Sequence, residues 1–93
     1  MAELVRCFGT ATGRVQGVGF RMFVQQQAME LDMTGWVKNM DDGSVTMEIQ
    51  GRQAAVDRLE QRIHEGNYFI KVKSFGLEPR PVQPDEKRFT IRY

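Results

Sequence analysis

The apolar residues of this 93-residue chain follow two different spacings, and the alternation between them limits the possible folds. From Phe20 to Leu31 they recur three, four, eight and eleven positions after the first, as on a helix packed on one face. Helical spacing returns over residues 52–65, where Gly66 follows as a C-terminal cap. We therefore expect two amphipathic helices, the first ending near Met33.

Strand-like sequence occupies the intervals around these helices. The expected strands cover residues 4–12, 34–40, 44–51, 68–77 and 88–93, and the second and third form a hairpin. In the third strand apolar and polar residues alternate, which predicts one buried and one solvated face of the sheet. All three prolines lie in residues 78–87, which we expect to be an irregular connection.

The order of these elements predicts a βαββαβ chain. Both helices must cover the same face of the sheet if both apolar stripes are to be buried. We therefore expect an α+β fold, a ferredoxin-like sandwich with an antiparallel sheet and two helices on one face. The chain is too short for two independent domains, so residues 1–93 should form one.

The charge balance excludes some partners. Thirteen Lys and Arg residues stand against twelve Asp and Glu, a net charge of +1, whereas DNA or anionic membranes need clustered cations. We expect a monomer without nucleic-acid or membrane partners. A single cysteine, Cys7, excludes an internal disulfide and suits a reducing compartment, so a cytoplasmic location is expected.

A glycine-spaced stretch, GRVQGVGFR at residues 13–21, joins the first strand to the first helix. Glycine permits positive φ and lacks a Cβ, so successive N–H groups can point inward around an anion. No side chain suited to an N-cap stands near Gly19, and Arg21 lies where the helix dipole disfavours a cation unless an anion binds too. The stretch therefore indicates a phosphate site, although a tight turn with a solvated Arg21 remains open. Known nucleotide-binding motifs do not match it.

Asn39 ends the first hairpin strand, directly before the turn sequence MDDGS. An Asn before a turn is usually structural. By strand parity, however, Asn39 shares a side with Val37 and could face the helix-covered side near the glycine loop. Its amide could then hold a water molecule.

Together these two stretches resemble the acylphosphatase family. GRVQGVGFR is similar to the family's phosphate loop, and GWVKNMDDGSVTMEIQG is similar to its catalytic hairpin. The resemblance extends over the whole chain, including its length, its βαββαβ order and its FTIRY ending. Ala11 departs from the larger aliphatic residue that the family more often has there, which affects strand packing more than chemistry.

The resemblance implies a metal-free hydrolysis of acyl phosphates to a carboxylate and inorganic phosphate, without cofactor or covalent intermediate. Arg21 and Asn39 would be the catalytic residues: Arg21 would bind the phosphoryl group and Asn39 would orient the attacking water. The backbone amides that bind phosphate with Arg21 would be those of Val15, Gln16, Gly17, Val18, Gly19 and Phe20. Inorganic phosphate would be both product and inhibitor.

Two alternatives belong to other functional classes. A non-catalytic module that binds phosphate or carbamoyl phosphate, resembling the N-terminal domain of hydrogenase-maturation proteins, would use the same loop. RNA recognition on this fold would need aromatic residues on the open face of the sheet, for which Phe8, Trp36 and Phe75 are candidates. The strand SVTMEIQG carries no aromatic residue, which places RNA binding last.

The other chemistry-bearing residues have structural interpretations. His64 lies in the last turn of the second helix, where the dipole favours it, and Asp41 and Asp42 read as turn formers more readily than as metal ligands. Cys7 is expected to be a small core residue. We expect core packing for three methionines on the first helical stripe, namely Met22, Met29 and Met33.

Overall fold

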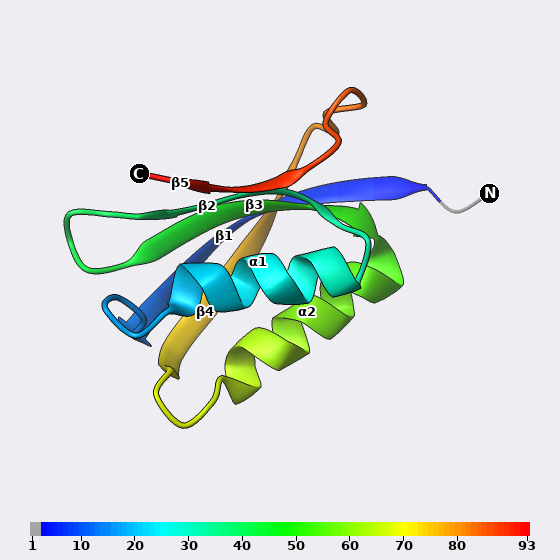
Figure 1. Cartoon of the computed structure of the whole chain (residues 1–93). Coiled ribbons are helices and arrows are strands. Elements are labelled where there is room, and N and C mark those ends of the chain that lie inside the picture. The colour runs from blue at the N-terminus through cyan, green and yellow to red at the C-terminus, as the bar shows by residue number, and fades with distance from the viewer. Residues whose placement is uncertain (1–2) are drawn as a thin grey trace.

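A computed structural model describes residues 3–93 as one five-stranded sheet with two helices on one face (Figure 1). The elements are β1 (Leu4–Arg14), α1 (Phe20–Glu30), β2 (Thr34–Asn39), β3 (Val45–Arg52), α2 (Gln53–Glu65), β4 (Lys71–Arg80) and β5 (Phe89–Arg92). The strand order is β4-β1-β3-β2-β5. This is the arrangement expected for a ferredoxin-like α+β fold.

The pairing of β5 differs from the rest of the sheet. The pairs β1–β3, β1–β4 and β2–β3 are antiparallel, as predicted, whereas β5 runs parallel to β2. Residues 35–38 of β2 lie opposite residues 89–92 of β5. The sheet is therefore mixed, and the end of the chain lies beside the strand that carries Asn39.

The core lies between the sheet and the helices. Helix α1 contributes Phe20, Val24 and Ala28 to it, in agreement with the predicted stripe. Packing was wrongly predicted for Met22 and Met29, which lie on the exposed side of α1. A residue two positions after Phe20 is turned by about 200° around the helix, away from the sheet. Helix α1 was predicted to end near Met33, but it ends three residues earlier, at Glu30. Met33 follows the helix and is buried.

Strand β4 begins and ends later than predicted. The side-chain oxygen of Asn67 accepts hydrogen bonds from the N–H groups of Phe69 and Ile70, at 2.8 and 2.9 Å, and so forms a turn where a strand was expected. The strand then continues through Pro79, which was assigned to the irregular connection. Because β4 is an edge strand, the missing N–H of Pro79 can face away from the sheet.

The face of the sheet opposite the helices is partly covered, which corrects the predicted solvated face. The connection 81–88 crosses this face (Figure 1) and buries Arg6 to 4% exposure. Arg6 donates to Glu48 at 2.6 Å and to Glu86 at 2.7 and 3.1 Å. Gln50 exchanges two hydrogen bonds with the backbone of Gln83, at 3.0 and 2.8 Å. These five residues are called the Arg6 cluster below.

The Arg6 cluster holds one cation between two carboxylates, those of Glu48 and Glu86. Burial alone would raise the pKa of Glu86, but its hydrogen bonds and the positive charge of Arg6 outweigh burial and hold that pKa below its ordinary value. The cluster therefore ties the connection 81–88 to the sheet through an ionised pair.

Candidate active site

The loop between β1 and α1 has two glycines in the left-handed region. Gly17 has φ 73° and Gly19, the N-cap residue of α1, has φ 79°. Non-glycine residues rarely adopt these angles, so both positions favour glycine. A Cβ built at either position would meet no atom within 4 Å, so both glycines border open space.

The backbone donors of this loop are unused. Within residues 3–93, no hydrogen bond uses the N–H groups of residues 16–22; the first N–H with a partner is that of Phe23, which donates to Gly19 at 2.9 Å. No side chain caps α1, and its first turn carries no acidic residue. The loop and the positive end of the helix dipole thus present free donors together.

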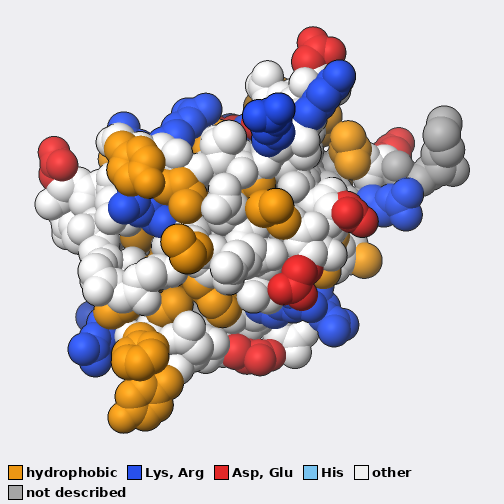
Figure 2. Space-filling view, viewed as in Figure 1, with side chains coloured by type: hydrophobic (Ala, Val, Ile, Leu, Met, Phe, Trp, Pro, Cys, Tyr) orange, Lys and Arg blue, Asp and Glu red, His pale blue; other side chains and the backbone are white. Residues whose placement is uncertain are grey.

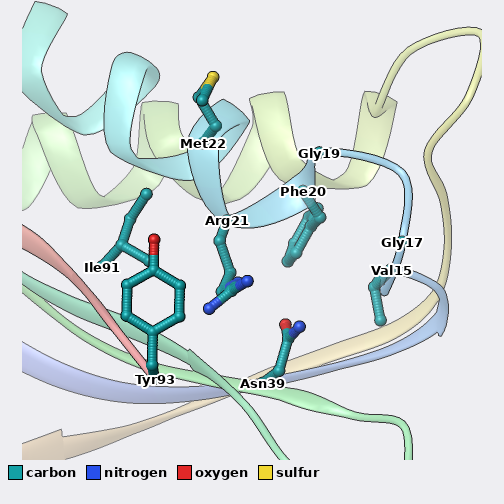
Figure 3. Close-up of a pocket in the computed structure, with 9 residues that line it drawn as sticks. All are labelled: Val15, Gly17, Gly19, Phe20, Arg21, Met22, Asn39, Ile91 and Tyr93. Carbon is teal, nitrogen blue, oxygen red and sulfur yellow. The ribbon is translucent and has the colours of Figure 1, made fainter.

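Arg21 extends from the first turn of α1 into the space beside this loop (Figure 3). One Nη1–H donates to the carbonyl oxygen of Arg92 at 3.0 Å, and the guanidinium carbon lies 4.7 Å from the centroid of the Tyr93 ring. A cation–π contact and a single hydrogen bond fix the orientation of the guanidinium. Its remaining N–H groups have no protein partner within the described chain.

Asn39, the last residue of β2, points toward the same space (Figure 3). Its side-chain oxygen Oδ1 is buried and accepts no hydrogen bond from any residue that the structure describes. Leaving a buried acceptor unpaired costs about 1–3 kcal/mol, so such groups are rare and generally bind water or a ligand. Asn39 is therefore placed to hold a small molecule by its oxygen.

The loop between β1 and α1 surrounds, together with Arg21 and Asn39, one cavity of about 210 Å³, called the loop cavity below. Its lining residues are Val15, Gly17, Gly19, Phe20, Arg21, Met22, Asn39, Ile91 and Tyr93. Five of the seven residues expected in the phosphate loop line it, and the exceptions are Gln16 and Val18. Val15 and Phe20 are buried residues, whereas Gly17 and Gly19 are exposed.

Gln16 joins the loop to the hairpin. Its side-chain amide donates to the carbonyl oxygens of Met40 and Ser44, at 2.7 and 2.9 Å. The same turn is closed by Asp42, whose carboxylate accepts from the N–H and the hydroxyl of Ser44 at 2.9 and 2.6 Å. These bonds lower the pKa of Asp42 and identify it as a turn former, and Asp41 precedes it in the same turn. Gln16 therefore fixes the loop relative to Asn39 from outside the cavity.

Three lining residues were missed as site residues from the sequence: Met22, Ile91 and Tyr93. Met22 was assigned to the core, and the FTIRY ending was only read as a strand. In a strand, alternate residues share a side, so the sequence of that ending already placed Ile91 and Tyr93 on the same side. This was the one feature of the sequence that could have linked the two residues to a common site. The parallel pairing of β5 with β2, which brings that side to the loop, is a long-range feature.

His64 and Cys7, two residues considered for a chemical role, both pack against other parts of the fold. The ring of His64 packs edge-on against Phe75, with centroids 5.9 Å apart. Burial raises the pKa of the Cys7 thiol, and the carboxylates of Glu60 and Asp57 raise it further, which opposes a nucleophilic role. No group of three potential metal ligands occurs among residues 3–93.

The three aromatic residues considered for RNA binding do not form one platform. Phe8 and Trp36 contact each other edge to face at 6.3 Å, whereas Phe75 packs against α2 on the opposite side of the sheet. The guanidinium groups of Arg80 and Arg92 lie over the rings of Phe8 and Trp36, at 4.9 and 4.5 Å. The described chain also contains no helix with the length and apolarity required to cross a membrane.

Comparison with known proteins identifies the family of this chain. The family model described as acylphosphatase matches residues 7–91. The acylphosphatase of Geobacillus thermodenitrificans is 54% identical over 81 residues, covering 87% of this chain and 86% of the relative. The crystal structure of acylphosphatase from Bacillus subtilis superposes with a TM-score of 0.90 at 36% identity, covering 96% of this chain and 99% of the other.

The chain therefore belongs to the acylphosphatase family, a family of hydrolases, and the expected fold and enzyme class are confirmed. Full-length HypF in a phosphate- and nucleotide-bound form is also similar in structure, with a TM-score of 0.91 at 24% identity. This chain covers only 12% of that protein. At that identity the likeness shows the fold alone, so it gives no separate support to a binding module.

Proposed function

We propose that the protein hydrolyses acyl phosphates in the loop cavity, with the phosphoryl group held by the loop and Arg21 and the attacking water held by Asn39. The observation that carries this proposal is the set of unpaired groups around one cavity. Free N–H donors and a guanidinium lie on one side, and the unpaired acceptor Asn39 Oδ1 lies on the other.

The donors match the charge of a phosphoryl group. The N–H groups of residues 16–22 can surround its oxygens, and the helix dipole adds positive potential. Arg21 supplies a planar fork of donors that fits two phosphoryl oxygens, which an ammonium group does not. Each well-placed donor stabilises the transition state by about 3 kcal/mol.

The water molecule needs orientation more than activation. The Asn39 oxygen accepts a hydrogen bond from one O–H of the water, which keeps that proton, and directs the water oxygen toward phosphorus, opposite the acyl oxygen. A new P–O bond forms while the bond between phosphorus and the acyl oxygen breaks, and the electron pair leaves with the carboxylate. The second water proton passes to a phosphoryl oxygen. Because a carboxylate is a good leaving group, a strong protein base is unnecessary.

The product explains the proposed inhibition by inorganic phosphate. Phosphate carries the same oxygens as the substrate's phosphoryl group and would occupy the same donors. It should therefore compete with the substrate. The positive charge required by this mechanism comes from Arg21, and the neutral N–H donors and the helix dipole add positive potential, so the proposed reaction uses no metal.

Substitution of Arg21 tests the proposal. With benzoyl phosphate as substrate and EDTA present, Arg21→Ala should lower kcat/KM by about 10²- to 10³-fold and weaken phosphate inhibition, since both depend on the guanidinium. Arg21→Lys should restore neither, because it lacks the fork. Arg58→Ala, an exposed arginine on α2, is the matched control and should change neither value.

Two results would contradict the proposal. Full recovery with Arg21→Lys would exclude the bidentate geometry. Tight phosphate binding by the wild-type protein without any turnover would instead identify a non-catalytic phosphate-binding module.

A further inference from the structure

The loop cavity has an apolar side that phosphate binding does not use. Besides the loop and its polar side chains, the lining includes Ile91 and Tyr93, across from the glycines, and Met22, which follows Arg21 on α1 (Figure 3). Tyr93 is 92% exposed and Met22 is 58% exposed, and Ile91 is half-buried. Figure 2 shows apolar side chains around a basic one at this end of the molecule. Large exposed apolar side chains grouped at one cavity indicate a binding function.

The position of this apolar side is fixed relative to Arg21. The Tyr93 ring packs beneath the guanidinium at 4.7 Å, and the preceding carbonyl, that of Arg92, accepts its hydrogen bond at 3.0 Å. Met22 follows Arg21 directly on α1. A molecule whose anionic end contacts Arg21 would therefore place its next atoms near Met22 and Tyr93.

An acyl phosphate has two ends of different chemistry. Its phosphoryl oxygens require the N–H groups and Arg21, and its acyl group is joined to phosphorus through a single oxygen. Within the lining of the loop cavity, the side chains left for that group are Met22, Ile91 and Tyr93. All three offer apolar surface, and Tyr93 also offers an aromatic ring.

We propose that Met22, Ile91 and Tyr93 form a subsite for the acyl group and that the enzyme prefers flat, apolar, aromatic acyl groups to short ones. An aromatic acyl group covers this surface, whereas an acetyl group covers little of it, and the free energy gained grows with the apolar area removed from water. The proposal rests on the proposed function, because the phosphoryl end must bind at the loop.

The test compares two substrates that share the phosphoryl end. Values of kcat and KM are measured for benzoyl phosphate and acetyl phosphate with the wild type, Tyr93→Ser and Met22→Ser. Each substitution should lower the ratio of the two kcat/KM values, benzoyl over acetyl, by about 3- to 10-fold, mainly through the KM of benzoyl phosphate. Both substrates bind Arg21 through the same phosphoryl group. An effect of Tyr93 on Arg21 therefore changes both kcat/KM values equally and cancels in their ratio. Tyr93→Phe should keep the wild-type ratio.

Two matched controls lie outside the cavity. Tyr68, which is 85% exposed, precedes β4, and Met29, which is 61% exposed, lies near the other end of α1. Neither Tyr68→Ser nor Met29→Ser should change the ratio.

The outcomes separate this inference from the proposed function. A wild type that hydrolyses both substrates without preference, or a ratio unchanged in Tyr93→Ser and Met22→Ser, overturns the subsite alone. Equal loss of activity toward both substrates in Tyr93→Ser would limit Tyr93 to positioning Arg21. A wild type that hydrolyses neither substrate overturns the proposed function together with the subsite.

Discussion

Two polar regions of this molecule differ in how their groups are paired. In the Arg6 cluster, on the face of the sheet opposite the helices, the guanidinium contacts two carboxylates and Gln50 exchanges hydrogen bonds with the backbone of Gln83. At the loop cavity, the N–H groups of residues 16–22 and Asn39 Oδ1 have no partner in the described chain. The first region satisfies its buried polar groups internally, whereas the second leaves the buried Asn39 Oδ1 and the N–H groups of an exposed loop without protein partners.

This difference separates stability from function. A buried polar group with a partner costs little, and a network of such groups fixes one arrangement of the chain. Buried groups without partners cost free energy in the empty protein and recover it when a ligand binds. Substitutions in the Arg6 cluster should therefore affect unfolding, and substitutions at the loop cavity should affect catalysis.

The largest expected effect is that of Asn39→Ala on turnover. Loss of the water-orienting oxygen should lower kcat by about 10²- to 10³-fold while the inhibition constant for phosphate stays within about 2-fold. The free energy of unfolding in urea should stay equal or rise, because the lost oxygen had no partner. Asn67→Ala provides the opposite control: its oxygen accepts two hydrogen bonds, so stability should fall while kcat is retained. Equal loss of phosphate binding in Asn39→Ala would refute its role.

Arg6→Met should have the largest effect on stability. It leaves the Glu48 and Glu86 carboxylates without their shared cation, which should lower the free energy of unfolding by about 3 kcal/mol. Activity below the unfolding transition should remain within about 2-fold of wild type. Urea unfolding and benzoyl phosphate hydrolysis measure the two quantities. Adding Glu86→Gln to Arg6→Met should recover part of the lost stability, and a further loss would exclude the ionic explanation.

Gln16→Leu tests the link between the loop and the hairpin. It removes the hydrogen bonds to Met40 and Ser44 without touching the cavity lining, so the loop should shift relative to Asn39. We expect a fall in kcat of about 10-fold, since small misplacements weaken in-line attack. Gln26→Leu, an exposed position on α1, is the control. Wild-type kcat in Gln16→Leu would show that other contacts position the loop.

The smallest expected effect concerns pH. The folded state lowers the pKa of Glu86, so its ionised form stabilises the fold above the ordinary Glu pKa of about 4.3 and this contribution is lost as pH falls. Glu86→Gln should be less stable than wild type at pH 7, and the difference should shrink in acid. Urea unfolding at pH 7 and at lower pH measures it. A constant difference at every pH would show that Glu86 acts only through packing.

Local patterns in the sequence were enough to predict the elements of the fold. Helix α1 was placed by the spacing of Phe20, Val24 and Ala28, because burial of one helix face leaves a direct trace in sequence. The start of β4 was misplaced because Tyr68 and Phe69 look strand-forming, while a single Asn67 side chain bends the chain into a turn. Whether such a segment forms a strand or a turn depends on a few side-chain hydrogen bonds, and the spacing of apolar residues in the sequence does not reveal them.

The site was predictable where its residues belong to continuous stretches. The glycine loop and Arg21 lie within nine residues, and strand parity placed Asn39 on the correct side. Tyr93 and Ile91 reach the cavity only because β5 pairs parallel with β2, far away in sequence. The burial of Gln50 likewise follows from a connection that crosses the sheet, so alternation alone predicted a solvated residue.

Titration with inorganic phosphate, followed by the amide resonances of isotopically labelled protein, tests the central claim most directly. Phosphate should shift the backbone amides of residues 16–22 and the side-chain amide of Asn39 with one common dissociation constant. The side-chain amide of Gln50, in the Arg6 cluster, should not move. Shifts at the Arg6 cluster without shifts at residues 16–22 would contradict the assignment of the unpaired donors as the phosphoryl site.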